Sequence, residues 1–362
     1  MGRYIVTRLL LIPVTLIGIV TLNFFIVQLA PGGPVDLMIA RLSGQDAAVA
    51  SRVPGSLDAV QSREASRSSD LGSAAGMDPA VIAAIEKEFG FDKPLHERYF
   101  KMLREYVVFD FGESFYLGRG VVDLVLERLP VSLSLGLWSM LLIYSISIPL
   151  GIAKAVNNGT RFDAWTSGVI FVAYATPGFL FAIFLIVMFA GGTFLNWFPL
   201  KGLTSTDFHA LSFFGKILDY FWHLALPVTA IAAGGFATLS MLTKNSFLEE
   251  ISKQFVLTAR AKGLNKRQVL YGHVFRNAML IVVAGFPSAL IGVLFTSALL
   301  IEVIFSLNGL GLLGFEAILT RDYPIIFGTL FCFTFIGLVL HLIGDIAYTL
   351  IDPRIDFETR EV

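Results

Sequence analysis

Cysteine and charge are both scarce in this chain, and each shortage excludes a class of protein. Cys332 is the sole cysteine among 362 residues, so neither an intramolecular disulfide framework nor a cysteine-based metal cluster can form. Charged residues make up 15% of the chain, against about 25% in soluble domains. The basic residues are scattered among apolar segments and form no basic domain, which predicts no nucleic-acid partner.

Motifs that carry bond chemistry are also missing. The sequence has no G-x-x-x-x-G-K-[ST] phosphate loop, no H-E-x-x-H pair and no G-x-S-x-G elbow, which argues against an ATPase, a metalloprotease and a serine hydrolase. The five histidines are isolated from one another, so no metal site is predicted. We therefore assign no catalytic residue and no bound cofactor to this chain.

Apolar residues are abundant instead. They make up 55% of the chain, with 33 Phe and a mean hydropathy of +0.73, which indicates a polytopic membrane protein. A helix needs about 20 apolar residues to cross roughly 30 Å of hydrocarbon. Six stretches meet that length, at about 9–30, 130–153, 165–190, 222–243, 278–303 and 325–350. The first exceeds the ~7–15-residue apolar core of a signal peptide, so an uncleaved helix is expected.

The distribution of Lys and Arg predicts the orientation of these spans. With both termini in the cytoplasm, the cytoplasmic segments carry thirteen basic residues and the short outer loops carry three. Short cytoplasmic loops are enriched in Lys and Arg, so this excess favours cytoplasmic N- and C-termini.

The long segment 31–129 lies outside the cytoplasm on this topology. Its part 43–76 is rich in Ser, Ala and Gly, which indicates a flexible insertion. Residues 78–127 are expected to form a small helical lobe. Asp78, followed by a proline, marks a helix start, and a second helix is predicted around 94–108 because its apolar residues share one side.

One cytoplasmic loop is polar yet patterned. Residues 258–277, "TARAKGLNKRQVLYGHVFRN", contain five basic residues and no acidic one. The spacing predicts a helix over 248–262, and Gly263 can take the left-handed conformation that ends a helix. Asn265 with Gln268 matches a capping box at the start of a second helix.

The surface of this helix–turn–helix is expected to be small or basic. Ala259, Ala261 and Gly263 would let the backbone enter a groove on another protein, and the neighbouring cations would suit an acidic rim. A cationic cytoplasmic loop also satisfies the positive-inside rule with no partner at all. The ordered pattern favours a docking element over that simpler interpretation.

Ionisable residues in the last two spans offer an alternative function. His341 and Asp345 are four residues apart, so they share a helix face and could form a proton relay in a proton-coupled secondary transporter. The simpler interpretation places Asp345 at the cytoplasmic interface, where it anchors the helix end. Glu302 is likewise expected to make a structural ion pair or hydrogen bond near the outer end of its span.

Several motifs in order resemble one family of permeases. "TARAKGLNKRQVLYGHVFRNAM" is similar to the EAA-type cytoplasmic motif of permease subunits of ATP-binding-cassette (ABC) importers, in the form found in the dipeptide/oligopeptide/nickel group. "RYIVTRLLLIPVTLIGIVTLNFFIVQLAPGGPVD", "FGFDKPLHERYFKMLREYVVFDFGESF" and "IEVIFSLNGLGLLGFEAILTRDYPII" resemble other segments of that group. The resemblance covers nearly the whole chain.

The resemblance implies an all-α membrane protein with the type I ABC importer permease fold: six transmembrane helices and a small helical periplasmic insertion between the first two. The expected parts are an N-terminus and first helix at 1–30, a periplasmic segment at 31–129, a five-helix core at 130–352 with a coupling loop at 244–277, and a cytoplasmic tail at 353–362. The expected location is the bacterial inner membrane.

It also implies a function and partners. The chain would form half of a pathway for ATP-driven import of peptides, microcin C-like peptides among them. Its partners would be a second homologous permease (a heterodimer), cytoplasmic ATP-binding subunits or one fused double ATPase, and a periplasmic peptide-binding protein. The residues expected to couple to the ATPase are Ala259, Arg260, Ala261, Lys262, Gly263, Leu264, His273, Arg276 and Asn277; no substrate-binding residue is assigned.

The chain departs from the family pattern at two places. Leu257, Thr258 and Ala259 stand where the general motif has Glu-Ala-Ala, so only the second alanine and the later Gly263 are retained. The proline that often follows the Arg-Asn-Ala triplet is replaced by Met279-Leu280-Ile281. Roles of individual motif residues therefore transfer most directly at Ala259 and Gly263.

Overall fold

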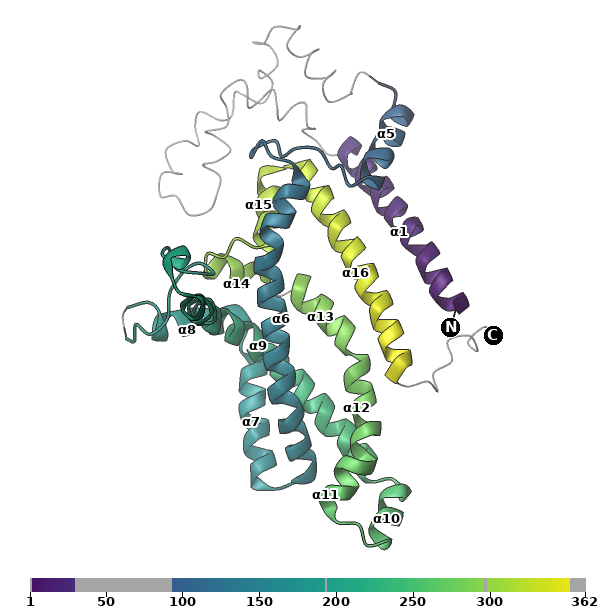
Figure 1. Ribbon diagram of the computed structural model, residues 1–362, viewed down its shortest axis with the longest axis vertical. Coiled ribbons are helices and arrows are strands. Elements are labelled where there is room, and N and C mark those ends of the chain that lie inside the picture. Colours follow the sequence, from purple (N-terminus) through teal and green to yellow (C-terminus); the bar gives the residue numbers. More distant parts are fainter. Residues whose placement is uncertain (1, 30–92, 193, 296–297, 352–362) are drawn as a thin grey trace. The chain divides into compact units, whose positions relative to one another are not determined.

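The described part of the chain is helical. A computed structural model describes residues 2–29, 93–192, 194–295 and 298–351 (Figure 1). Within these ranges every regular element is a helix, and one isolated β-bridge joins Glu113 and Gly120. The all-α prediction is confirmed. The insertion at 43–76, the helix start at Asp78 and the tail at 353–362 lie outside the described residues.

Most predicted spans are long apolar helices. Those that carry continuous candidate spans are α1 (Gly2–Leu29), α6 (Val121–Val156), α9 (Phe213–Ile251) and α16 (Tyr323–Ile351). A fifth candidate span runs over Lys266–Gly292. The second helix begins nine residues before the predicted 130, because Pro130 lies inside α6 without ending it. Pro149 and Pro227 are likewise accommodated inside α6 and α9.

The third predicted span, 165–190, is not one straight helix. It consists of α7 (Arg161–Ala175) and α8 (Gly178–Phe189), bent by 98° at the short break between them. The residue before a proline is driven out of the helical region, and Thr176, before Pro177, has φ −85° and ψ 118°. The prediction of six spans holds only if this bent pair counts as one.

The fifth predicted span, 278–303, is divided as well. It contains α12 (Phe275–Ala284), α13 (Phe286–Phe295) and α14 (Ala298–Ile304), with a break at Gly285. The span-length helical run starts earlier, at Lys266, so it includes residues that the sequence assigned to the cytoplasmic loop. A shorter apolar helix, α15 (Leu310–Thr320), precedes α16.

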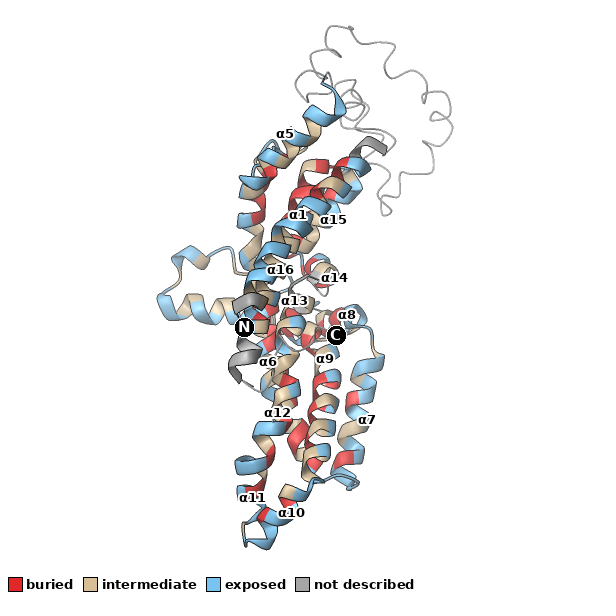
Figure 2. Ribbon diagram, turned by 90° about the vertical axis from the view of Figure 1, so that its right-hand side faces the viewer, coloured by how far each residue is buried: buried red, intermediate tan, exposed pale blue. Residues whose placement is uncertain are grey.

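The described residues divide into two compact units. Unit 1 comprises the described parts of Met1–Ile12, Leu124–Leu319 and Cys332–Val362, and unit 2 those of Pro13–Asp123 and Thr320–Phe331. In unit 1, α9 is the central helix: it packs against α7, α8 and α12 and carries many buried residues (Figure 2).

Helices α6 and α9 approach closely because small residues face each other. A Cβ added to Gly151 would lie 2.6 Å from the Cβ of Thr243 and 2.8 Å from the carbonyl oxygen of Ser240. Ser147 Oγ, also on α6, donates to the carbonyl of Phe236 at 3.4 Å. Small-residue contacts of this kind let helix backbones pack tightly in a membrane.

Glu302 stabilises the start of α15 from a buried position. Its carboxylate accepts hydrogen bonds from the Leu312 amide at 2.7 Å and from Ser132 Oγ at 2.9 Å. Ser132 Oγ in turn accepts from the Leu310 amide at 2.9 Å. A carboxylate beside the exposed amides of a helix start is electrostatically favourable. The predicted structural hydrogen bond of Glu302 is confirmed.

Unit 2 contains the predicted second helix of the outer segment. That helix is α5 (Leu95–Val107), and it contacts α1 through Tyr99, whose hydroxyl lies 2.7 Å from Thr21 Oγ1. Its end joins an aromatic cluster of Tyr106, Phe109, Phe111 and Phe331. Residues 108–120 are not helical, so the helical description of 78–127 fits only part of the described lobe.

Candidate functional site

The predicted docking loop begins with a break that the sequence pattern missed. Helix α9 ends at Ile251, and α10 (Gln254–Ala261) starts after Lys253, so 248–262 is not one helix. Lys253 takes an extended conformation and pairs with Glu249 and Glu250 on the last turn of α9. The hydrogen bond to Glu250 raises the pKa of Lys253. A local pair therefore stabilises the break without any proline or glycine.

The turn after α10 has the predicted geometry. Gly263 has φ +85°, and its amide donates to the carbonyl of Arg260 at 2.9 Å. Helix α11 (Lys266–Val269) then starts with a reciprocal capping box. The Gln268 amide donates to Asn265 Oδ1 at 2.9 Å, and the Asn265 amide donates to Gln268 Oε1 at 3.0 Å. The predicted left-handed glycine and capping box are confirmed.

Helix α11 runs directly into a membrane span. It continues through η3 (Leu270–Val274), a single π-helical turn in which the Phe275 amide donates to the Leu270 carbonyl, and then into α12. The loop is therefore an extension of the span Lys266–Gly292 and not a separate flexible connection.

An apolar cluster holds the loop against the ends of α6 and α9. Val256, Val269 and Val274 are buried there with Ile152 of α6 and Phe247 of α9. Ala259 is buried in the same cluster, with 6% of its surface exposed. The prediction that Ala259 lies on the docking surface is wrong, because its small side chain packs inside this chain.

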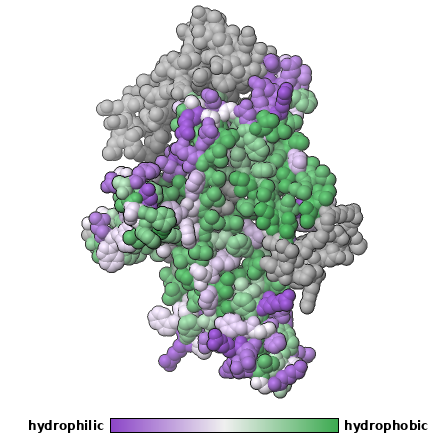
Figure 3. Space-filling view, in the orientation of Figure 1, coloured by the Kyte–Doolittle hydropathy of each residue, from purple (hydrophilic) through white to green (hydrophobic). Residues whose placement is uncertain are grey.

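The other predicted coupling residues are accessible. Leu264 is half-buried, and the remaining ones are exposed: Arg260, Ala261, Lys262, Gly263, His273, Arg276 and Asn277. Hydrophilic residues gather at the end of unit 1 formed by α10 and α11 (Figure 3). Leu257 and Tyr271 are 62% and 55% exposed, and the sequence pattern assigned neither of them to the docking surface. Single exposed apolar side chains are common on protein surfaces, so these two add apolar area to the loop without by themselves marking a partner.

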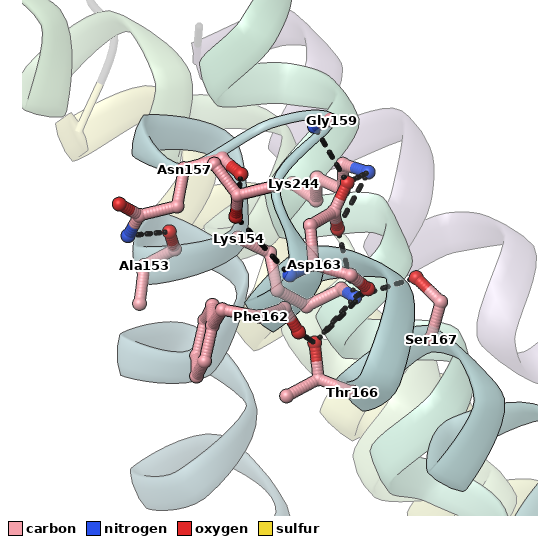
Figure 4. A network of polar contacts seen from close by, with 10 residues as sticks. Ala153, Lys154, Asn157, Gly159, Phe162, Asp163, Thr166, Ser167 and Lys244 are labelled. Carbon is pink, nitrogen blue, oxygen red and sulfur yellow. Dashed lines mark hydrogen bonds and ion pairs between the residues drawn. The ribbon is translucent and has the colours of Figure 1, made fainter.

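A buried ionic network braces the neighbouring α6–α7 turn (Figure 4). Lys154 of α6 is fully buried, and its Nζ lies 3.0 Å from Asp163 Oδ1 of α7. Lys244 of α9 contacts both carboxylate oxygens of Asp163 at 2.8 Å. The Gly159 amide also donates to this carboxylate, at 3.1 Å. One aspartate therefore joins three helices at the same end of unit 1 as the loop.

The Lys154 ammonium makes further hydrogen bonds, which offset the cost of burying its charge. Its ammonium donates to the Asp163 carbonyl at 3.0 Å, to Thr166 Oγ1 at 2.9 Å and to Ser167 Oγ at 2.7 Å. By sequence, Lys154 and Lys244 are two of the thirteen basic residues expected in cytoplasmic segments, with no partner predicted for either. Asp163, nine residues after Lys154 across a tight turn, was the available signal for a pair.

Asp345 makes contacts that anchor a helix end. Its carboxylate accepts a hydrogen bond from the Tyr4 hydroxyl at 2.9 Å and lies 3.6 Å from Arg8 Nη2, both on α1. His341 is exposed. These contacts join the start of α1 to the end of α16 and favour the anchoring interpretation over the proton relay.

Comparison with known proteins identifies the family. The family described as "Binding-protein-dependent transport system inner membrane component" matches residues 147–357. The chain belongs to this family. The permease is 56% identical to the inner membrane ABC transporter permease protein YejB of Escherichia coli O157:H7, over 99% of this chain and 100% of that protein.

Two further relatives also align over nearly their full lengths. The peptidoglycan transport system permease protein YejB of Agrobacterium fabrum is 55% identical, over 100% of both chains. The oligopeptide transport system permease protein AppB of Bacillus subtilis is 31% identical, over 99% of this chain and 100% of its own. The permease is therefore an all-α, multi-pass membrane subunit of a binding-protein-dependent ABC transporter. The alternative of a proton-coupled transporter has no support among these relatives.

Proposed function

We propose that this permease forms half of the membrane pathway of an ATP-driven peptide importer in a bacterial inner membrane. The observation that carries the proposal is end-to-end similarity to permeases named for oligopeptide and peptidoglycan transport. Both cargoes contain peptide bonds, so peptide-containing compounds are the substrate class. Microcin C-like peptides fall within that class.

The second half of the pathway would be a homologous permease, and ATP would be bound and hydrolysed by cytoplasmic subunits. A periplasmic peptide-binding protein would deliver the cargo. Both termini of this chain would lie in the cytoplasm. This chain would perform no bond chemistry itself.

The loop from α10 to η3 would be the place where the ATPase couples to the spans. Its turn offers exposed cations, and Leu257 and Tyr271 add apolar contact area. Helix α11 continues through η3 into α12. Movement of an ATPase subunit bound to the turn would therefore be transmitted to the span that contains α12. ATP binding would then shift the population between inward- and outward-facing states through its differential contacts with the loop.

Substitution of Gly263 tests this proposal. Gly263→Val should leave the permease in the membrane but lower ATP-dependent peptide uptake by more than about tenfold. A β-branched residue disfavours the left-handed conformation by about 1–2 kcal/mol, so the turn should open. Steric crowding would not cause this loss of uptake, because no heavy atom lies within 4 Å of a Cβ added to Gly263.

Gly192→Val is the matched control. Gly192 also has positive φ, +70°, and no atom within 4 Å of an added Cβ, but it lies in a loop predicted to be outside the cytoplasm. Uptake of labelled peptide and capture of ATPase subunits by the tagged permease are measured for both variants. Normal uptake by Gly263→Val would contradict the coupling assignment.

A further inference from the structure

The exposed surface of α9 changes in character along the helix. Over 213–229, the exposed side chains are large and apolar in every case but Thr229. Over 230–248, the exposed residues are Gly234, Thr238, Met241 and Asn245. None of these four is aromatic or a branched aliphatic residue, although the segment lies within a candidate membrane span. These four residues are named the α9 stripe.

The residues of the α9 stripe share one side of the helix. They are spaced i, i+4, i+7 and i+11, and helical residues at such intervals lie above one another. Thr229 precedes Thr238 by nine residues, so at about 100° per residue it projects from the opposite side. No heavy atom lies within 4 Å of a Cβ added to Gly234, so the space beside the stripe is open at that point.

Two threonines show how the two sides of α9 differ. Thr229 Oγ1 donates to the carbonyls of Ala225 and Leu226 at 2.8 and 2.9 Å, and its side chain lines an apolar groove. A hydroxyl that bonds to its own helix is suited to an apolar surrounding. Among the residues that the structure describes, neither the Thr238 hydroxyl nor the Asn245 side-chain amide has a hydrogen-bond partner. Hydrocarbon offers these groups none, so the stripe is suited to water or a polar ligand.

The stripe covers the half of the predicted span that lies nearer the coupling loop. Gly234 is near the middle of the apolar stretch 222–243, and Asn245 follows its end by two residues. The helix rises about 16 Å from Gly234 to Asn245, which is half of a hydrocarbon core of about 30 Å. Helix α9 then ends at Ile251, where the loop begins. The stripe therefore leads from the middle of the span to the side where imported cargo would be released.

We propose that the α9 stripe lines the inner half of the peptide pathway and contacts the backbone of the passing cargo. This inference rests on the proposed function and adds a cargo-contacting surface to it. Thr238 and Asn245 each offer a hydrogen-bond donor and an acceptor, which match the C=O and N–H groups of a peptide backbone. The stripe carries no charge, so its contacts would not depend on charged side chains in the cargo. Gly234 leaves room for the cargo backbone to approach α9 closely.

Cysteine labelling of the assembled transporter tests whether water reaches the stripe. Thr238→Cys and Thr229→Cys are made separately in a Cys332→Ser background, and a membrane-impermeant methanethiosulfonate is added to inside-out membrane vesicles. The reagent reacts with the thiolate, which forms in water and is disfavoured in apolar surroundings. Thr238→Cys should react at least about tenfold faster than Thr229→Cys. Equal rates, or a slower reaction of Thr238→Cys, would overturn the proposal.

Photo-cross-linking identifies what occupies the stripe. The photoreactive residue p-benzoylphenylalanine replaces Met241 or, in the control, Phe221, whose exposed fractions are 39% and 41%. These two positions are twenty residues apart, so they project from nearly opposite sides of α9. Cells that contain the complete transporter are irradiated during uptake of a radiolabelled tripeptide. The replacement at Met241 should yield a labelled permease–peptide adduct, and the replacement at Phe221 should not.

The outcomes separate this inference from the proposed function. If the wild type does not take up the tripeptide, the proposed function fails, whereas labelling of Thr238→Cys still reports whether the stripe faces water. If the wild type takes up the tripeptide but the Met241 replacement forms no adduct with it, the pathway assignment alone fails. An adduct at Met241 with another subunit, and none with the peptide, would assign the stripe to a subunit contact and overturn the inference.

Discussion

Asp163 balances two lysines that come from different helices, so this end of unit 1 depends on a single carboxylate. Asp163→Asn would leave Lys154 buried without a counter-ion and Lys244 without its bidentate partner. Breaking a buried pair from one side costs about 3 kcal/mol or more. We expect a lower midpoint of thermal unfolding in detergent and less permease in the membrane.

Asp207→Asn is the control for this prediction. Asp207 is exposed and makes no side-chain capping bond to η2 (Phe208–Ala210). The same chemical change there should alter the midpoint by less than about 1 °C, because surface substitutions away from special features shift stability little. Equal midpoints for the two variants would show that the network adds nothing to stability.

Single residues were the least predictable level from sequence. Gly263 could be predicted because its role follows from its own backbone conformation. The burial of Ala259 could not, because it depends on the end of α6, which lies far earlier in the sequence. Asp163 signalled a possible partner for Lys154, but the full burial of Lys154 depends on how α7 folds back against α6. A lysine near the end of a span satisfies the positive-inside rule whether it is exposed or fully buried.

At the scale of elements, the Asn265 cap makes α11 a defined helix despite its length. Asn265→Ala removes the acceptor for the Gln268 amide and should destabilise the start of α11 by about 1 kcal/mol. Amide hydrogen exchange at Gln268 should accelerate about fivefold. Asn265→Asp keeps the acceptor and should keep the slow exchange; equal rates in both variants would contradict the capping role.

The contact between α6 and α9 gives a second prediction for elements. Gly151→Ala would place its methyl group against the Thr243 side chain and the Ser240 backbone, neither of which can move freely. Overpacking of this kind costs about 1–3 kcal/mol. We expect a lower unfolding midpoint for the detergent-solubilised permease.

Gly234→Ala provides the comparison on α9. No atom lies within 4 Å of a Cβ added to Gly234, so its midpoint should stay equal or rise slightly. A similar loss in both variants would contradict the assignment of the cost to the close approach of α6 and α9, because helix propensity favours Ala over Gly at both positions.

Elements were predictable where a local signal defines them. The capping box, the left-handed glycine and most apolar spans follow from patterns within a few residues. The break at Lys253 has no proline or glycine to mark it, since contacts with Glu249 and Glu250 stabilise it. Pro177 is a sequence signal for the bend between α7 and α8. The apolar run continues across this proline, so hydropathy alone predicted one straight span.

At the scale of the whole molecule, orientation in the membrane is the main prediction still untested. Cys332 is the sole cysteine, so a Cys332→Ser background accepts single reporter cysteines. Lys201→Cys should react with a membrane-impermeant maleimide added to intact spheroplasts. Lys262→Cys should react only after the membrane is opened, because its loop is predicted to face the cytoplasm.

Labelling of Lys262→Cys in intact spheroplasts would reverse the predicted topology. It would also remove the loop from the side where ATP is available, and the coupling proposal would fail with it. A third reporter, Lys216→Cys, lies in the same predicted outer loop as Lys201 and should give the same labelling pattern.

The π-turn η3 has a consequence for how this region tolerates length changes. Five residues fill a turn in which the Phe275 amide reaches back to Leu270, so η3 contains one residue more than an α-helical turn needs. Deleting one codon within 270–274 would convert it to ordinary α-helix without breaking the chain. Because the π-turn takes up its extra residue within one turn, α11 and α12 would keep nearly the same faces toward their neighbours. A one-residue deletion should therefore be tolerated better within 270–274 than in the regular α-helix that follows, where it would rotate the chain by about 100°.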